Sequence, residues 1–156
     1  MRKVNVAVIG TGRIGRIHAR NLKFQIPGAK LLAVADVVAE SAQNVADELE
    51  IPVCETDYRR LLANDDIQAV VICSSTDTHA RIMIEAAKAG KHIFCEKPID
   101  HDLSKIDAAL DAVEKAGVKL QIGFNRRFDP NFRKVRAMIA DGKIGEPQII
   151  RITSRD

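Results

Sequence analysis

Short apolar runs alternate along this chain with segments in which apolar residues recur at helical spacing. Val4 to Ile9 is apolar except for Asn5 and stops at Gly10, as a buried parallel strand would. Residues 76–88 repeat apolar side chains on one face and end near Gly90, which is typical of an amphipathic helix. The pattern predicts strands at 4–9, 30–36, 53–54, 69–73, 92–95 and 118–122, with helices at 13–25, 41–49, 58–62, 76–88 and 103–115.

Strands that alternate with helices in this way predict an α/β fold, a doubly wound parallel sheet of the Rossmann type with right-handed crossovers. We expect residues 1–122 to form this core and residues 123–156 to connect it to a second, substrate-binding domain. In the connection, 130–140 is predicted to be helical and 148–153 to be a strand, with Asp141-Gly142-Lys143 between them. Ile150 and Ile152 alternate with polar residues there, so this strand should expose an apolar face that favours self-association.

The strongest chemical motif lies at the end of the first predicted strand. Gly10-Thr11-Gly12-Arg13-Ile14-Gly15 fits the pattern GxGxxG between a strand and a helix. Gly10 permits the tight turn, Gly12 lets a pyrophosphate approach the backbone, and Gly15 lets the helix pack closely on the strand. The pyrophosphate would bind the free N–H groups at the helix N-terminus. A glycine turn without a ligand is the structural alternative, and the flanking strand and helix disfavour it.

Asp36 closes the second predicted strand, where an acidic side chain can accept hydrogen bonds from the adenosine ribose. Its carboxylate would repel a 2′-phosphate, and the following Val37-Val38 offers no arginine to bind one. NAD is therefore favoured over NADP as the cofactor. Arg13 keeps the alternative open, because a flexible guanidinium in the glycine loop can reach a phosphate.

Composition narrows the class of protein further. The chain has 156 residues, a net charge of +3 and no long run of like charges, which argues against nucleic acid and membrane surfaces as partners. Its three cysteines form no CxxC pair, and we expect buried free thiols in a reducing, cytoplasmic compartment. The N-terminus leads straight into a strand, so no signal peptide is expected. His18, His92 and His101 have no metal-ligand spacing, and no metal site is predicted.

Several further segments together resemble a known family. The glycine loop is followed by Arg16-Ile17-His18-Ala19, the fourth strand by Ser74-Ser75-Thr76-Asp77-Thr78-His79, and the fifth strand ends in Cys95-Glu96-Lys97-Pro98. With Gly123-Phe124-Asn125-Arg126-Arg127-Phe128-Asp129, these segments resemble the glucose–fructose oxidoreductase and inositol dehydrogenase family, and its inositol 2-dehydrogenases in particular. The resemblance covers essentially the whole chain.

The resemblance implies an NAD-dependent dehydrogenase acting on a polyol or sugar, with Lys97 as its catalytic lysine. In the family this lysine lies beside the nicotinamide and the reacting hydroxyl, and its ammonium can stabilise a developing alkoxide. The bond before Pro98 is often cis in the family, which would aim the lysine.

The resemblance also implies further binding residues. Those expected at the cofactor are Gly10, Thr11, Gly12, Arg13, Ile14, Asp36, Val37, Ser74, Ser75, Thr76, His79, Glu96 and Lys97; those expected at the substrate are Asn125, Arg126 and Asp156. A guanidinium at Arg126 suits the adjacent hydroxyls of an inositol. Two structural alternatives stay open: Thr76 is equally suited to cap the following helix, and His79 to pack in its first turn.

Family members are about twice as long, and their second domain supplies an aspartate and a histidine to catalysis, with no matching positions here. We therefore expect this chain alone to bind NAD without turnover, and its parent to form a homo-oligomer. Two other interpretations remain open: the NAD-binding half of another sugar or cyclitol dehydrogenase, and a non-catalytic nucleotide-binding module. A methyltransferase is disfavoured, because Glu96-Lys97-Pro98 has no role there.

Overall fold

A six-stranded parallel sheet forms the centre of the first of two compact units, which ends at Gly123. The computed structural model describes residues 3–153, and its strands lie in the order β3-β2-β1-β4-β5-β6. Every pairing in the sheet is parallel. The strands are β1 (Val4–Ile9), β2 (Ala29–Ala35), β3 (Val53–Glu55), β4 (Ala69–Ile72), β5 (His92–Cys95) and β6 (Leu120–Ile122). The predicted Rossmann fold is therefore confirmed.

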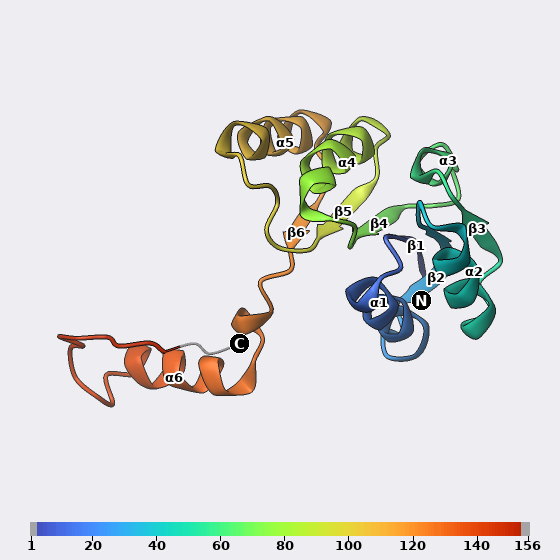
Figure 1. The fold of residues 1–156 in the computed structure, drawn as a ribbon. Helices are drawn as coiled ribbons and strands as arrows, with labels where there is room; N and C mark the ends of the chain where they lie inside the picture. The colour runs from blue at the N-terminus through green and yellow to red at the C-terminus, as the bar shows by residue number, and fades with distance from the viewer. Residues whose placement is uncertain (1–2, 154–156) are drawn as a thin grey trace. The chain divides into compact units, whose positions relative to one another are not determined.

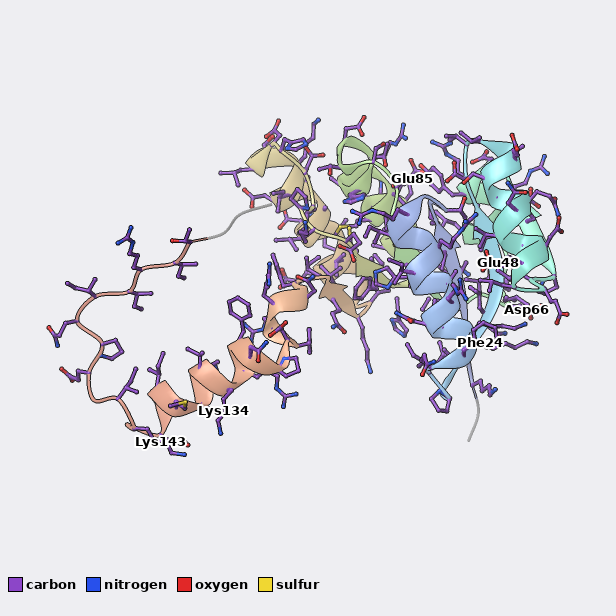
Figure 2. The ribbon with its side chains drawn as sticks, turned by 60° about the horizontal axis from the view of Figure 1, so that its bottom comes forward. Phe24, Glu48, Asp66, Glu85, Lys134 and Lys143 are labelled. Atoms are coloured by element: carbon purple, nitrogen blue, oxygen red, sulfur yellow. The ribbon has the colours of Figure 1, made fainter. Side chains whose placement is uncertain are left out.

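Helices cover both faces of the sheet. They are α1 (Arg13–Phe24), α2 (Ala39–Glu48), α3 (Tyr58–Leu62), α4 (Thr76–Lys88) and α5 (Leu103–Ala116). Helices α1 and α2 lie on one face of the sheet, and α3, α4 and α5 lie on the other (Figure 1). Their buried side chains form one apolar core on each face. The outer surfaces of these helices carry apolar as well as polar side chains; Phe24, the last residue of α1 and labelled in Figure 2, is 62% exposed. None of the helices in residues 3–153 is long and apolar enough to cross a membrane.

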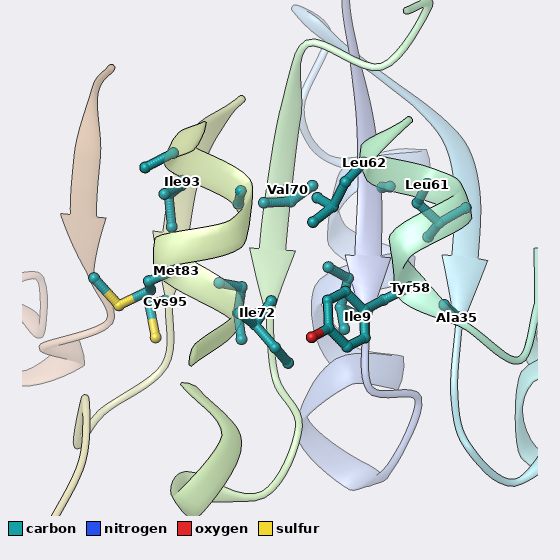
Figure 3. Close-up of a cluster of buried hydrophobic side chains, with 14 of the residues drawn as sticks. Ile9, Ala35, Tyr58, Leu61, Leu62, Val70, Ile72, Met83, Ile93 and Cys95 are labelled. Carbon is teal, nitrogen blue, oxygen red and sulfur yellow. The ribbon is translucent and has the colours of Figure 1, made fainter. Parts of the chain in front are cut away.

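Each central strand contributes to both cores because successive side chains of a strand point to opposite faces. In β1, Ala7 and Ile9 pack with α3, α4 and α5, whereas Val6 and Val8 pack with α1 and α2. Figure 3 shows the first of these cores, where Met83 of α4 lies among strand side chains. This two-sided burial explains why the strands are continuous apolar runs rather than alternating ones.

The strand order reverses between β1 and β4. The chain runs from β1 outward to β2 and β3, returns to β4 beside β1, and continues outward to β5 and β6. Loops at the carboxyl ends of two such neighbouring strands diverge to opposite faces and leave a crevice, which is where ligands bind in open α/β sheets. The residues that follow β1 and β4 are the glycine loop and Ser74-Ser75.

Residues from Phe124 onward form a second compact unit. It contains the short helix η1 (Asn125–Arg127) and α6 (Pro130–Ala140), which matches the predicted helix. The predicted strand at 148–153 is wrong: this segment has no regular structure. A strand needs a neighbour to accept its backbone hydrogen bonds, and no strand among the described residues pairs with it. Ile150 and Ile152 are exposed, as expected.

Candidate functional site

The glycine loop after β1 has one glycine that the protein's own packing does not explain. Gly10 has φ +91°, and a Cβ there would lie 2.5 Å from the Ser74 nitrogen. A Cβ on Gly15 would overlap the carbonyl oxygen of Gly10, so α1 could not approach the loop. Gly12 is different, because a Cβ there would meet nothing within 4 Å. The open space above Gly12 is consistent with a ligand that approaches the backbone at this point.

The N-terminus of α1 is left free for an anion. Gly12 is its N-cap, no side chain caps the helix, and its first turn contains no acidic residue. Helices α3, α5 and α6 instead begin at aspartates whose carboxylates accept backbone N–H groups. Helices α2 and α4 also lack a side-chain cap, but each has an acidic residue in its first turn. The first-turn N–H groups of α1 therefore keep their hydrogen-bonding capacity and their positive dipole end. Ile14 lies in this turn and is 36% exposed.

Asp36 is fixed against the glycine loop. Its Oδ2 accepts hydrogen bonds from the Thr11 backbone N at 2.7 Å and the Thr11 hydroxyl at 3.0 Å. Its Oδ1 accepts the Val38 backbone N at 3.0 Å. Since a carboxylate has about four acceptor positions, one position on Oδ1 remains for a ribose hydroxyl. Thr11 is 2% exposed and hydrogen-bonds Ser41, so it positions Asp36 from within the protein.

A cavity of about 440 Å³ lies at the crevice, within the usual size range of small-molecule sites. Its wall includes six residues predicted for the cofactor: Gly10, Gly12, Asp36, Val37, Ser74 and Ser75. Cys73 lies beside them in the same wall. The second half of the wall was missed by the sequence analysis. It comprises Thr56, Tyr58, Thr78, Arg81 and Ile82, which come from the loop after β3 and from α3 and α4.

Two residues that were predicted to bind the cofactor, Arg13 and Thr76, do not line this cavity. Arg13 does not line the cavity; it lies along the outer side of α1 in a depression with Arg16 and Arg20. Thr76 is not the N-cap of α4, because the helix already begins at Thr76 and Ser75 precedes it as the cap. The capping interpretation of Thr76 is therefore wrong. The turn is closed by Thr78, whose hydroxyl bonds Ser74 Oγ at 2.7 Å and the Ser75 carbonyl at 2.7 Å.

Lys97 follows β5, the neighbour of β4, and its side chain is exposed. The Lys97–Pro98 peptide bond is cis, as the family resemblance implied. The backbone N–H of Lys97 donates to Glu96 Oε2 at 3.2 Å. Glu96 Oε1 in turn lies 2.8 Å from His18 Nε2, a contact that the sequence analysis missed because 78 positions separate the two residues.

His79 is buried, with 2% of its surface exposed. Its Nδ1 lies 2.9 Å from the Pro98 carbonyl oxygen and its Nε2 lies 2.8 Å from the Ser74 carbonyl oxygen. His79 is therefore packed in the first turns of α4, and it is not among the residues that line the cavity. Its ring nitrogens contact the loop after β4 at the Ser74 carbonyl and the loop after β5 at the Pro98 carbonyl.

The cysteines are free thiols, but only Cys95 is fully buried; Cys54 and Cys73 are half-buried. Burial and the neighbouring Glu96 carboxylate raise the pKa of the Cys73 and Cys95 thiols to about 12. These thiols are therefore neutral near neutral pH and are not nucleophiles in the site. Among residues 3–153 there is no group of three or more potential metal ligands.

The remaining predicted residues belong to the second unit or lie outside the described chain. Asn125 and Arg126 are exposed in η1, and the Arg126 guanidinium lies 5.1 Å from the centre of the Phe132 ring. Asp156 lies outside the described residues.

Comparison with known proteins shows the family to which the fold belongs. A model of the oxidoreductase family with an NAD-binding Rossmann fold matches residues 4–124. The myo-inositol 2-dehydrogenase of Thermotoga maritima is 44% identical over 98% of this chain and 46% of its own length. The inositol 2-dehydrogenase of Rhizobium meliloti is 46% identical over 98% of this chain and 46% of its own length. The chain thus spans about half the length of these curated relatives.

The solved structures give the same picture. The scyllo-inositol dehydrogenase of Lactobacillus casei, with bound NAD(H) and scyllo-inositol, superposes with a TM-score of 0.89 at 34% identity. The match covers 93% of this chain and 43% of that one.

Proposed function

This chain belongs to the oxidoreductase family with an NAD-binding Rossmann fold, and from that premise we propose that it holds the cofactor of an NAD-dependent inositol 2-dehydrogenase. One observation carries the proposal. The cavity lined by the loops after β1 and β4 occurs together with the Glu96-Lys97-Pro98 segment, which follows the neighbouring strand β5. Bound NAD would supply the hydride acceptor for oxidation of a ring carbinol of myo-inositol to the ketone of an inosose.

Different residues of this chain bind different parts of the cofactor. The free N–H groups of the α1 N-terminus bind the pyrophosphate above Gly12, and Asp36 accepts a hydrogen bond from the adenosine ribose. Val37, which is 88% exposed at the rim of the cavity, offers an apolar surface to the adenine. Ser74 and Ser75 bound the same cavity.

Lys97 has the catalytic role. Its ammonium donates a hydrogen bond to the oxygen of the reacting hydroxyl, which stabilises the alkoxide that develops while the hydroxyl proton leaves to a base. Asn125 and Arg126 bind neighbouring hydroxyls of the polyol, since amide and guanidinium groups donate to several oxygens at once. Asp156 is proposed to face the substrate.

The experiment has two steps. Calorimetric titration of the chain with NAD tests the cofactor, and NADH formation in a protein of its relatives' length that contains this chain tests the substrate. We expect NAD binding, and turnover of myo-inositol in preference to glucose; scyllo-inositol is the comparison for a relative such as that of Lactobacillus casei. Turnover of another sugar without turnover of any inositol would show that the substrate is that sugar and not an inositol. NAD binding with no turnover of any polyol would favour a nucleotide-binding module.

We also place the protein in a reducing, cytoplasmic compartment as a homo-oligomer. Its free thiols suit such a compartment, and Ile149, Ile150 and Ile152 are 89%, 72% and 79% exposed. Contiguous exposed apolar side chains favour association, so light scattering should show an apparent mass that rises with concentration. A constant monomer mass up to high concentration would contradict the association.

A further inference from the structure

The Lys97 side chain forms no ion pair among the described residues. Its position therefore depends on the contacts of the residues on either side of it. Lys97 lies on the segment Glu96-Lys97-Pro98, which leaves the sheet at the end of β5. The point from which the Lys97 side chain starts is therefore set by whatever holds the backbone on each side of it.

On one side, His79 of α4 holds the segment. Its ring lies between the carbonyl oxygens of Pro98, at 2.9 Å, and Ser74, at 2.8 Å. A carbonyl oxygen only accepts hydrogen bonds, so a neutral ring donates to one of the two and an imidazolium donates to both. Burial of the ring removes water as a substitute partner. His79 thus joins the residue after Lys97 to the loop that lines the nucleotide cavity.

On the other side, His18 of α1 holds the segment through Glu96. His18 Nε2 lies 2.8 Å from Glu96 Oε1, and the His18 ring packs on Phe94 with 5.1 Å between centroids. The second carboxylate oxygen of Glu96 accepts the Lys97 backbone N–H at 3.2 Å. The carboxylate also fits closely against Gly123, where a Cβ would lie 3.1 Å from its atoms.

We infer that His79 and His18 are positioning residues that hold the Glu96-Lys97-Pro98 segment between α4 and α1 and so fix where Lys97 presents its ammonium. Both tethers end on residues directly adjacent to Lys97. Both begin on the helices that follow β4 and β1, the two strands that bound the nucleotide crevice. The position of the lysine is therefore tied to the loops that hold the cofactor. The action of Lys97 on an alcohol rests on the proposed function; the tethering does not.

Lys91 provides a matched control. It is 6% exposed, and its Nζ also bridges two carbonyl oxygens, those of Asn64 at 2.8 Å and Ile67 at 2.9 Å. It precedes β5, so its contacts lie at the opposite end of the strand from Lys97. Lys91→Met removes two buried tethers of the same kind without touching the Lys97 segment.

The test is hydrogen–deuterium exchange of the chain without NAD. His79→Leu and His18→Ala are expected to speed exchange of the Lys97, His101 and Asp102 amides by about tenfold relative to β1 and β4 amides, as expected for loss of one hydrogen bond. His79→Gln, which keeps a donor, should restore part of the protection. Lys91→Met should speed exchange near residues 64–67 and leave the Lys97 segment unchanged.

Unchanged exchange in the Lys97 segment of folded His79→Leu and His18→Ala would overturn the inference. So would acceleration that is uniform over the sheet and equal to that of Lys91→Met, since this would be global destabilisation. If His79→Leu does not fold, His18→Ala, which removes the contact on the other side of the segment, gives the same two outcomes. In an active dehydrogenase, His79→Gln should lower kcat about tenfold with the KM for NAD unchanged within threefold. Because exchange is measured without NAD, failure of NAD binding would refute the proposed function and leave the tethering to be judged by exchange.

Discussion

Replacing Gly12 by alanine should weaken NAD binding while leaving the fold intact. Gly12 has φ −64° and ψ −169°, a conformation open to alanine, and the added Cβ would meet no protein atom within 4 Å. At an N-cap, alanine in place of glycine costs below about 1 kcal/mol of stability. The methyl group would instead occupy the space where the pyrophosphate approaches the backbone.

The expected loss of affinity follows from the hydrogen bonds displaced. A hydrogen bond from an N–H group to a charged oxygen is worth about 1.5–3 kcal/mol, so losing one weakens binding by about 10- to 150-fold. Calorimetry with NAD measures the affinity, and denaturant unfolding measures the stability of the same preparation.

Two other glycines are the controls. Gly28→Ala also adds a Cβ that meets nothing within 4 Å, but it lies in the turn before β2, so it should change neither quantity. Gly15→Ala forces α1 away from the Gly10 carbonyl oxygen and should cost at least about 2–3 kcal/mol of stability. NAD affinity within threefold of the unmodified chain in folded Gly12→Ala would show that no pyrophosphate approaches this backbone. A stability loss as large as that of Gly15→Ala would show that Gly12 is needed for the fold.

Three further predictions concern the cofactor carboxylate, the catalytic lysine and the thiols. Asp36→Asn should narrow the preference for NAD over NADP by at least about tenfold in calorimetry, because the charge that repels a 2′-phosphate is gone; an unchanged preference would show that another residue sets it. Lys97→Met should leave the Kd for NAD unchanged within threefold and abolish polyol oxidation, and retained turnover would remove Lys97 from the catalytic role. The pKa of the Cys73 and Cys95 thiols is about 12 in the folded protein, against about 8.5 in an unfolded chain, so the folded state keeps protons that the unfolded state loses. The free energy of unfolding should therefore fall above pH 9 by up to about 1.4 kcal/mol per pH unit for each thiol, a loss that continues until the pH passes about 12. Denaturant unfolding at pH 9 and 10 should show a smaller fall in the Cys73→Ala/Cys95→Ala variant, and equal falls would contradict the assignment.

The sequence predicted the parts of the site that depend on local geometry. The glycine loop and Asp36 follow their strands directly, and a parallel sheet brings the carboxyl ends of neighbouring strands together, so their meeting could be foreseen. Tyr58 and Arg81 line the same cavity, but from α3 and α4. Their presence depends on which helix covers which face, and local patterns do not state that.

The errors have physical causes of the same kind. Residues 148–153 alternate like a strand, yet a strand forms only where a neighbour accepts its hydrogen bonds. In Ser74-Ser75-Thr76-Asp77-Thr78, several consecutive side chains suit a helix cap, so composition could not choose among them. The contact of His18 with Glu96 joins helix α1 to the end of β5 and has no signal in sequence spacing.

The central claim is that this chain is built to bind NAD. The most direct test is a calorimetric titration of the chain with NAD and with NADP, at one pH and salt concentration. We expect one NAD site per chain and NADP binding at least about tenfold weaker, because the Asp36 carboxylate would repel a 2′-phosphate. No binding of NAD, or NADP bound as tightly as NAD, would contradict it.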